Sequence, residues 1–426
     1  MLHICALGLA WWHISGALIL SGAPGSRMVA LGRLIGLLVG SAVLLQLALV
    51  SRLPWIEPSL GCDRLYRLHR YCGFVVAALF LGHPVLLTLG NARRHHVAPS
   101  RQFLDIATDW PYARPAIVAS VIIALVVASS VPPLRRRLTY DAWHGGHLAM
   151  YFAVGLASLH QASGAEMLKQ LWWGWYWMAL HFAVVGALVV FRAGRPLFKL
   201  AQHRFRIDRI VSESDDVTSV YLTGRRLERF SFRGGQYANV AFLTKGLWVP
   251  HPFSFSSAPN GRFLRISIKA VGDFTSRIRD LTPGAVVLLE GPLGAFTTAG
   301  AAIGRKYLMV AGGIGITPIR ALIESLAVDD RDVVLVYAAR TVNDLVFAAE
   351  LRGLTPRCHF VLSLAANTDD GHEHGRVDGA MLARLVPDVQ EREAFVCGPP
   401  PMMNSVIGAL RVLGVSGSRI HHERFA

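Results

Sequence analysis

The chain has 426 residues, of which 53% are hydrophobic and only 17% are charged. Soluble domains average about 25% charged residues, so the composition argues against a wholly soluble protein. The net charge is +15, but residues 1–199 carry +11 of it and residues 200–426 carry only +4, which indicates basic loops between membrane spans and argues against a nucleic-acid-binding domain.

Six apolar stretches in the first 199 residues are predicted to be membrane helices. Most reach the about 20 residues that a hydrocarbon core of about 30 Å requires, while the fifth is short and interrupted by polar residues. The stretches are 2–21, 28–50, 69–90, 112–132, 146–162 and 173–191. Basic loops after the second, fourth and sixth stretches predict that both termini are cytoplasmic in a multi-pass inner-membrane protein. A smaller basic group falls on the opposite side: Arg93, Arg94, Arg101 and Arg114.

Histidines are the chemical signal of this region, which contains ten of the chain's 17. His69 and His83 lie 14 residues apart in the third stretch, and His147 and His160 lie 13 apart in the fifth. Polar groups are costly inside a membrane, and the matched spacings predict two stacked haems, each ligated by one imidazole from each helix. The expected pairs are His69 with His147 near the cytoplasm and His83 with His160 near the exterior. Bis-imidazole ligation suits electron transfer.

A histidine in a membrane helix can instead form a hydrogen bond to a neighbouring helix, and this is our interpretation of His13 and His181. The paired histidines also carry a geometric difficulty, because 13 residues rotate an ideal helix by about 220°. For His147 and His160 both to face a haem, we expect a π-bulge or kink, for example near Gly155.

After Lys199 the pattern changes from long apolar runs to short alternating segments. Residues 200–300 predict a small antiparallel β-barrel that lacks long helices; its strand segments are 205–211, 217–223, 236–242, 263–269 and 286–290. Residues 301–426 alternate strands with helices and predict an α/β domain with a parallel sheet. The expected fold is therefore a membrane all-α six-helix bundle in residues 1–199, followed by these two soluble domains.

Three motifs stand out in the soluble part. HPFSFSSAP (251–259), followed by IKAVGDFTSRI (268–278), offers hydroxyls and backbone amides that can hold a flavin ring and a pyrophosphate, although alone it could be a surface hairpin. VAGGIGITPI (310–319) follows a strand and opens a helix, so that Gly312, Gly313 and Gly315 allow a diphosphate to approach the helix N-terminus. FVCGPPPMM (395–403) is a strand that runs into a turn, where Cys397 on its own is most simply a packed residue.

In this order the soluble motifs resemble the ferredoxin–NADP reductase superfamily. Joined to six spans with paired histidines, the whole chain resembles the ferric reductase and NADPH oxidase transmembrane family. That resemblance implies two b-type haems in the membrane region, FAD on the barrel, and NADPH or NADH on the α/β domain. The five scattered cysteines offer no CxxC pair for a disulfide framework or an iron–sulfur cluster.

The resemblance also implies roles for single residues. The FAD-binding residues would be His251, Pro252, Phe253, Ser254, Ser257, Lys269, Gly272, Thr275 and the C-terminal aromatic Phe425. The nucleotide-binding residues would be Gly312, Gly313, Gly315, Thr317 and Arg340, with Cys397, Gly398 and Pro399 beside the nicotinamide. Ser254, Cys397 and Phe425 would lie nearest the reacting atoms. His251 stands where soluble members often carry Arg.

The sequence leaves alternatives open for the nucleotide that donates electrons and for the acceptor that receives them. The segment AART (338–341) has no carboxylate for a ribose hydroxyl, so Arg340 favours NADPH over NADH unless it is a solvated surface residue. Electrons would pass from cytoplasmic NAD(P)H to an acceptor on the outer face. A ferric chelate, attracted by the basic loop 91–102, would make the protein a ferric reductase. Dioxygen would make it a superoxide-forming oxidase. The third hypothesis is a haem electron-carrier subunit that serves a partner protein, and the sequence identifies no such partner.

Overall fold

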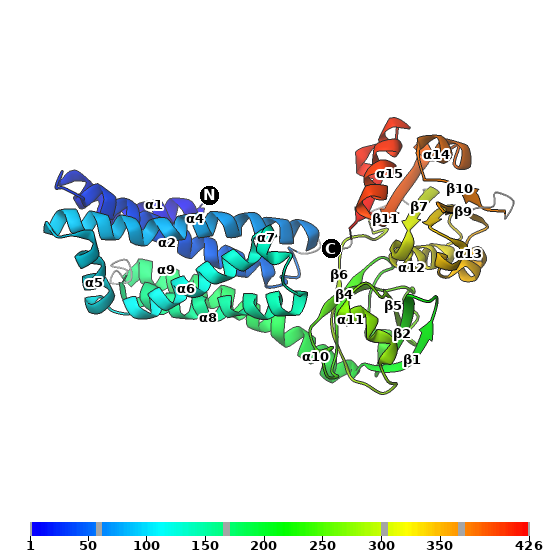
Figure 1. Cartoon of the computed structure of the whole chain (residues 1–426), viewed down its shortest axis with the longest axis horizontal. Helices are drawn as coiled ribbons and strands as arrows, with labels where there is room; N and C mark the ends of the chain where they lie inside the picture. The colour runs from blue at the N-terminus through cyan, green and yellow to red at the C-terminus, as the bar shows by residue number, and fades with distance from the viewer. Residues whose placement is uncertain (1, 57–61, 165–170, 300–305, 365–370, 425–426) are drawn as a thin grey trace. The chain divides into compact units, whose positions relative to one another are not determined.

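The computed structural model describes residues 2–56, 62–164, 171–299, 306–364 and 371–424 (Figure 1). The chain divides into two compact units. The first is helical and consists of Met1–Ile56 and Asp63–Ala193, and the second contains the chain from Gly194 on.

The described residues of the helical unit contain all six helices expected from the apolar stretches, with two shorter helices between them. Its elements are α1 (Leu2–Leu20), α2 (Ser26–Val50), α4 (Cys62–His95), α5 (Pro99–Asp109), α6 (Ala113–Ser130), α7 (Pro132–Arg135), α8 (Tyr140–Gly164), α9 (Leu171–Ala187) and a π-helix (Leu188–Gly194). By length and composition, five segments of the described chain could cross a membrane: Leu2–Leu20, Ser26–Val50, Arg64–His95, Ala113–Ser130 and Trp172–His203. Helix α8 has 25 residues and is long enough to span, but it is not among these five.

Small side chains let the helices of this unit approach closely. Ala119 and Ile123 of α6 pack against Ala153 of α8, with Phe80 of α4 beside them. Helix α8 is α-helical from Tyr140 to Gly164 with no π-turn, so the π-bulge expected near Gly155 is wrong, while the alternative kink stays a prediction. The partner helix α4 contains Pro84 directly after His83 and remains α-helical around it.

The second unit begins with α10 (Arg195–His203) and an antiparallel β-barrel. One sheet has the order β1 (Arg206–Ser212), β2 (Val217–Thr223), β5 (Leu264–Lys269), and the other has the order β4 (His251–Ser254), β3 (Tyr237–Phe242), β6 (Val287–Leu293). Buried and less buried residues alternate along β6, as expected when only one face of a strand meets the core. The core contains Phe205, Val240, Phe242, Phe255 and Ile266, all completely buried. Helix α11 (Asp273–Ser276) lies between β5 and β6 in the sequence.

A parallel sheet follows, in the order β10 (Glu373–His374), β9 (Arg357–Leu362), β8 (Val333–Ala339), β7 (Lys306–Gly312), β11 (Arg392–Cys397), β12 (Ile420–Glu423). Helices α12 (Ile316–Ala327) and α13 (Ala348–Leu354) cover one apolar face, and α14 (Gly379–Leu385) and α15 (Pro400–Val412) cover the other (Figure 1). Burial on both faces explains the continuous apolar runs in these strands. The 3-10 turns of the unit are Leu227–Arg229, Ile278–Asp280, Gly313–Gly315, Val342–Asp344, Val389–Glu391 and Gly417–Arg419. The structure confirms the expected fold class.

Candidate functional site

The order in which the chain adds strands to the parallel sheet reverses between β7 and β11. After β7 the chain adds β8, β9 and β10 on one side, and it then returns to place β11 on the other side. Both strands are parallel and in register, with Cys397 opposite Ala311. Their C-terminal ends therefore bring the loop that begins at Gly312 against the turn at Gly398. Open α/β sheets bind ligands at this kind of crevice.

Close backbone packing explains most of the glycines at this crevice. A Cβ on Gly315 would overlap the carbonyl group of Cys397, and a Cβ on Gly312 would lie 3.0 Å from Cδ of Pro399. Gly313 differs, since its φ is +52° and an added Cβ would meet no atom within 4 Å. Gly313 is thus the glycine that leaves open space beside the loop, as backbone approach to a diphosphate requires.

Two other residues predicted for this crevice, Thr317 and Cys397, have side chains that contact the protein itself. Thr317 is buried, and its hydroxyl donates a hydrogen bond to the Ile314 carbonyl at 3.0 Å. Cys397 is completely buried among the apolar residues that pack between the sheet and α12. Burial raises the pKa of the Cys397 thiol well above its ordinary value, so the thiol is protonated at neutral pH and is no nucleophile.

The serine-rich motif forms β4 and the bend after it. Ser254 is 5% exposed and Ser257 is 1% exposed, and the hydroxyl oxygen of each is buried without a hydrogen-bond partner in the described structure. Buried hydroxyls are normally satisfied, so two such oxygens close together in sequence indicate a polar ligand at this strand. The donor and acceptor capacity of two hydroxyls fits the polar edge of a flavin.

Aromatic rings lie beside this strand. The ring centroid of His251 is 3.8 Å from that of Phe274, and Phe253 and Phe274 are nearly parallel at 6.2 Å. Pro252, which lies between His251 and Phe253 in the sequence, is exposed. His251 is thus part of an aromatic group on the barrel surface. It stands where soluble members of the ferredoxin–NADP reductase superfamily often carry arginine.

The segment after β5 closes on itself. The Thr275 hydroxyl accepts hydrogen bonds from the backbone amides of Val271, at 2.9 Å, and Gly272, at 3.0 Å. Lys269 pairs with Asp216 at 2.9 Å. Burial is the largest single influence and would raise the pKa of Asp216, but the hydrogen bonds from Lys269 and Ser214, together with the charge of Lys269, lower that pKa overall.

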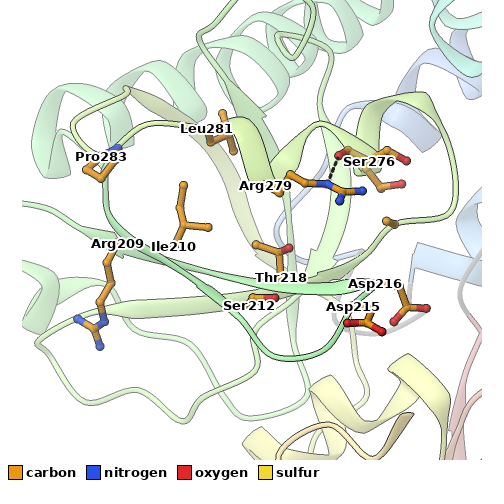
Figure 2. Close-up of a pocket in the computed structure, with 12 residues that line it drawn as sticks. Arg209, Ile210, Ser212, Asp215, Asp216, Thr218, Ser276, Arg279, Leu281 and Pro283 are labelled. Atoms are coloured by element: carbon orange, nitrogen blue, oxygen red, sulfur yellow. Dashed lines mark hydrogen bonds between the residues drawn. The ribbon is translucent and has the colours of Figure 1, made fainter. Parts of the chain in front are cut away.

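A cavity of about 480 Å³ opens beside this segment (Figure 2). Its lining includes Thr275, Ser276, Arg279, Asp215 and Asp216, and Figure 2 shows Ser276 and Arg279 above Asp215 and Asp216. Of the two residues of this segment predicted to bind FAD, Thr275 lines the cavity and is hydrogen-bonded to the backbone beside it, and Lys269 pairs with Asp216 of the lining. Ser254 and Ser257, in contrast, retain free hydroxyl capacity.

Arg340 follows the last residue of β8, at the same end of the sheet as Gly312. Its side chain is exposed, and no hydrogen bond or ion pair of its guanidinium is present in the described part of the chain. A guanidinium at this edge is accessible to an anion. Phe425, the predicted flavin-stacking aromatic, lies outside the described residues.

In the helical unit two of the predicted ligands, His69 of α4 and His147 of α8, lie against each other. The ring centroids of His69 and His147 are 6.1 Å apart. Two imidazoles on opposite sides of one metal ion, each with a nitrogen about 2 Å from the metal, would have ring centroids roughly 6 Å apart. The Nδ1 atoms of His69 and His147 are buried without a hydrogen-bond partner in the described structure. The pair therefore fits a shared haem iron.

The second pair has a different setting. His83 Nδ1 lies 2.8 Å from the Gly32 carbonyl oxygen of α2, and a Cβ on Gly36 would lie only 2.6 Å from the imidazole Cε1. A ligating histidine typically donates its other ring nitrogen to such an acceptor. The described residues contain no cluster of three or more metal-ligating side chains, so histidine pairs, rather than a compact ion site, are the feature of this unit.

Sequence reasoning missed one polar cluster. Arg265 of β5, Arg320 of α12 and Glu350 of α13 meet where the barrel packs on the parallel sheet. The only local signal was a charged pair, Arg320 and Glu324, four residues apart in an otherwise apolar helix. No short motif contains the partners, because they come from distant parts of the chain.

Comparisons with known families agree with this division. The family described as ferric reductase like transmembrane component matches residues 35–158, which include His69, His83 and His147, while His160 lies two residues beyond the match. The FAD-binding domain family matches residues 203–295, and the oxidoreductase NAD-binding domain family matches residues 309–407. A transmembrane helical component joined to a flavin- and nucleotide-binding module defines a membrane-bound flavoprotein. The chain has the domain architecture of the ferric reductase and NADPH oxidase type.

Relatives match about half of the chain. An NADPH oxidoreductase of Mycobacterium tuberculosis is 29% identical over 54% of this chain and 62% of its own length. The NADH oxidoreductase HCR of Escherichia coli is 30% identical over 52% of this chain and 67% of its own length. The chain thus spans slightly less than two thirds of the first of these relatives. A solved FAD/NAD-binding domain of nitric oxide dioxygenase from Vibrio cholerae is 26% identical, covering 52% of this chain and 97% of that domain with a TM-score of 0.47.

Proposed function

We propose that the protein transfers electrons across a membrane from NAD(P)H, through FAD and two b-type haems, to an acceptor on the outer face. The proposal is supported by one combination: a pair of imidazoles 6.1 Å apart between two membrane helices, in the same chain as a flavin- and nucleotide-binding module. A flavin- and nucleotide-binding module joined to a membrane helix bundle with paired histidines is explained if electrons pass from the flavin to haems in the bundle.

The cofactors would supply the redox chemistry when bound, because a flavin exchanges two-electron for one-electron transfer and bis-imidazole haem carries single electrons. The chain's own residues bind and orient these groups. Ser254 and Ser257 would donate to and accept from the flavin. Gly313 and the first turn of α12 would hold the nucleotide diphosphate. Residues Gly398 and Pro399 would lie beside the nicotinamide, with the buried Cys397 as packing behind them.

His69 with His147, and His83 with His160, would hold one haem each. The Gly32 carbonyl would orient the His83 ring, as a hydrogen-bonded carbonyl does for many metal-bound histidines. Both axial positions would be filled by nitrogen, which leaves the iron without an open position for oxygen. This favours outer-sphere electron transfer over oxygen binding at iron.

For the acceptor, we propose a chelated ferric ion, which would make the protein a ferric reductase. The exposed basic residues Arg93, Arg94 and His95 at the end of α4 support an anionic substrate. Superoxide formation from dioxygen is the second candidate, since filled axial positions do not prevent electron loss at a haem edge. We further propose that the protein lies in the inner membrane, with both of its termini on the cytoplasmic side.

Vesicles test the direction and the path. The purified protein is placed in liposomes that contain trapped ferricyanide, and NADPH is added outside. The expected result is loss of the trapped ferricyanide absorbance that depends on NADPH and disappears in the His69→Ala variant. NADPH oxidation without loss of trapped ferricyanide in intact vesicles would sink the transmembrane proposal.

A second assay separates the acceptors. NADPH is supplied under air with ferric citrate and a ferrous-iron chelating dye, or with cytochrome c with and without superoxide dismutase. A ferric reductase forms the ferrous dye complex in the presence of the dismutase. Dismutase-sensitive cytochrome c reduction at a comparable rate would instead favour the oxidase.

A further inference from the structure

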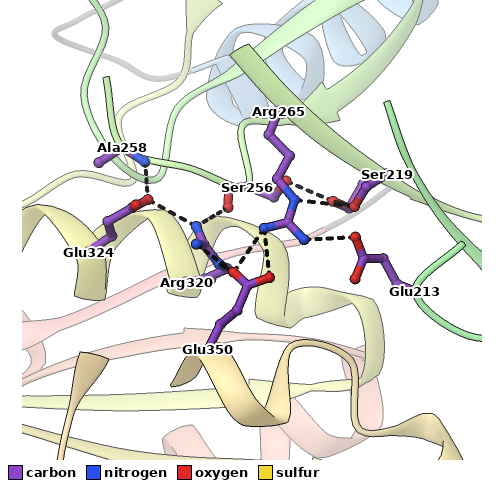
Figure 3. Close-up of polar contacts among 9 residues, drawn as sticks. Glu213, Ser219, Ser256, Ala258, Arg265, Arg320, Glu324 and Glu350 are labelled. Carbon is purple, nitrogen blue, oxygen red and sulfur yellow. Dashed lines mark hydrogen bonds and ion pairs between the residues drawn. The ribbon is translucent and has the colours of Figure 1, made fainter. Parts of the chain in front are cut away.

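A buried ion-pair network joins the barrel to the parallel sheet (Figure 3). Arg265, only 3% exposed, donates to both carboxylate oxygens of Glu350, at 3.1 and 2.9 Å, and to Glu213 at 2.7 Å. Arg320, 7% exposed, donates from Nε to the same Glu350 at 2.7 Å. One carboxylate from α13 therefore bridges a guanidinium from the barrel and another from α12.

The same network grips the backbone of the serine-rich motif. The Ser256 carbonyl accepts a hydrogen bond from Arg320 Nη1 at 2.6 Å, and the Ala258 amide donates to Glu324 at 2.6 Å. On the other side, the Ser256 amide donates to the Arg265 carbonyl at 2.8 Å. Ser257, whose hydroxyl is buried without a partner, lies between these fixed peptides.

Serine hydroxyls continue the network inside the barrel. The Ser256 and Ser267 hydroxyls are 2.7 Å apart, and Ser267 and Ser219 are also 2.7 Å apart. Ser219 in turn accepts from Arg265 Nε at 3.3 Å. The bend after β4 is thus held by side chains from both domains.

The position of Arg320 connects two functional motifs. It lies in the second turn of α12, the helix whose beginning is the glycine loop Gly313–Gly315. Arg320 therefore reaches from the helix that would bind the nucleotide to the peptide beside the residue that would bind the flavin. Burial alone would raise the pKa of Glu350, but hydrogen bonds from Arg265 and the attraction of Arg320 hold that pKa below its ordinary value. The bridge is therefore ionised at neutral pH.

We propose that Arg320 is a positioning residue for hydride transfer: through Ser256 and Glu350 it fixes the flavin-binding bend against the helix that begins with the nucleotide-binding loop. This inference rests on the proposed function. Hydride transfer requires the reacting atoms to be about 3–3.5 Å apart, and a misplacement of about 1 Å can cost roughly a hundredfold in rate. A planar guanidinium that binds a carboxylate and a carbonyl together sets such a distance better than a flexible ammonium.

The test compares Arg320→Lys and Glu350→Gln with a matched control, Arg392→Lys. Arg392 is also a fully buried arginine with two carboxylate partners, at 2.8 Å from Asp388 and 3.0 Å from Asp332. It lies at the opposite end of β11 from Cys397, away from both motifs. The control therefore reports what the loss of a buried arginine network does to the module in general.

Two measurements are made on the full-length protein in detergent. Hydrogen–deuterium exchange of the peptide that covers residues 254–258 is expected to be faster in Arg320→Lys and Glu350→Gln than in the wild type and in Arg392→Lys. The limiting anaerobic rate of flavin reduction by NADPH is expected to fall about tenfold or more in these two variants, with FAD content and half-saturating NADPH within about twofold of the wild type.

Each other outcome is decisive. Unchanged exchange at residues 254–258 would show that Arg320 and Glu350 do not hold the bend after β4, which overturns the proposal. Faster exchange with an unchanged limiting rate overturns the positioning role of Arg320, as does an equal loss of rate in Arg392→Lys. If the wild type reduces no flavin with NADPH or NADH, the proposed function fails, and a positioning role in hydride transfer is overturned with it; the exchange measurement still decides separately whether Arg320 holds the bend.

Discussion

Gly398 lies directly against the backbone nitrogen of Gly312, so that a Cβ on Gly398 would be only 3.0 Å from it. The contact joins the ends of β7 and β11, where the sheet changes direction. Gly315 continues it, because its α-carbon faces the carbonyl of Cys397. Glycine is required at these positions by the packing of one loop on the other. Gly313 is required for another reason, its positive φ and the open space beside it.

This difference predicts that two alanine substitutions act differently, one mainly on stability and the other mainly on nucleotide binding. Gly315→Ala would force the Cys397 carbonyl away, so we expect a large fall in the thermal unfolding midpoint. Gly313→Ala has room for its Cβ and costs only about 1–2 kcal/mol for its left-handed backbone, but the methyl group occupies the space proposed for the diphosphate. We expect weaker NADPH binding with a modest loss of stability, measured by thermal unfolding and nucleotide titration. Wild-type NADPH affinity in Gly313→Ala would contradict the assignment.

The buried hydroxyl of Ser257 gives a second prediction. Because it has no hydrogen-bond partner in the described structure, Ser257→Ala should leave the FAD-free protein as stable as the wild type or slightly more stable. FAD affinity should fall about tenfold, as expected when one polar contact is lost. Ser325→Ala is the matched control, because that hydroxyl donates to its own helix at the Ala321 carbonyl. Equal FAD affinities in Ser257→Ala and the control would remove Ser257 from the flavin site.

Local patterns predicted much of this architecture. The apolar runs gave the positions of the membrane helices, and Gly-rich turns after apolar strands marked the ends of β7 and β11, because the signal in each case lies within about 20 neighbouring residues. The buried network was not predictable in the same way. Arg265, Arg320 and Glu350 are neighbours only after two domains have packed, and nothing near any one of them identifies the other two.

The histidine spacing shows the limit of ideal-helix arithmetic. It placed a π-bulge or kink in α8, for example near Gly155, yet α8 contains no π-turn. The calculation treated each imidazole as fixed to its Cα direction, whereas side-chain torsions move the ring several ångströms. It also ignored Pro84, which removes a backbone hydrogen bond from α4 beside His83.

Haem content provides the third prediction. His69→Ala and His147→Ala should each lose one haem, because each removes one of two imidazoles that meet between α4 and α8. His181→Ala is the control, since His181 Nδ1 lies 2.9 Å from the Trp177 carbonyl of its own helix. The measurement is the reduced-minus-oxidised spectrum with haem-to-flavin stoichiometry. Full haem content in His69→Ala or His147→Ala would exclude that residue as a ligand, and haem loss in His181→Ala would point to a general effect on the bundle.

Arg340 gives the fourth prediction, on nucleotide choice. Its exposed guanidinium at the end of β8 is available to a 2′-phosphate, which NADPH has and NADH lacks. Arg340→Gln should therefore lower kcat/KM for NADPH about tenfold or more, as expected for a lost charge-assisted contact, with little change for NADH. Arg376→Gln, another exposed arginine of the same domain, serves as the control for net charge. An equal decrease for both nucleotides would show that Arg340 does not read the phosphate.

The buried thiol of Cys397 gives the last prediction, which concerns pH. Burial raises its pKa well above the ordinary value, and burial also raises the pKa of Cys358 to about 11. Above about pH 8.5, thiols of the unfolded chain release protons that the folded protein retains. The unfolded state then binds fewer protons, so stability must fall as pH rises above that value and must be unaffected by these thiols below it.

We therefore expect the thermal midpoint to decline between pH 8.5 and pH 10, and to decline less steeply in Cys397→Ala. Iodoacetamide at pH 8.5 should leave the buried Cys397 unmodified in the folded protein. If Cys397 packs beside the nicotinamide without ionising, the limiting rate of flavin reduction should also be independent of pH from 7 to 9. A rate that rises with pH in the wild type and becomes flat in Cys397→Ala would show instead that a thiolate takes part in the reaction.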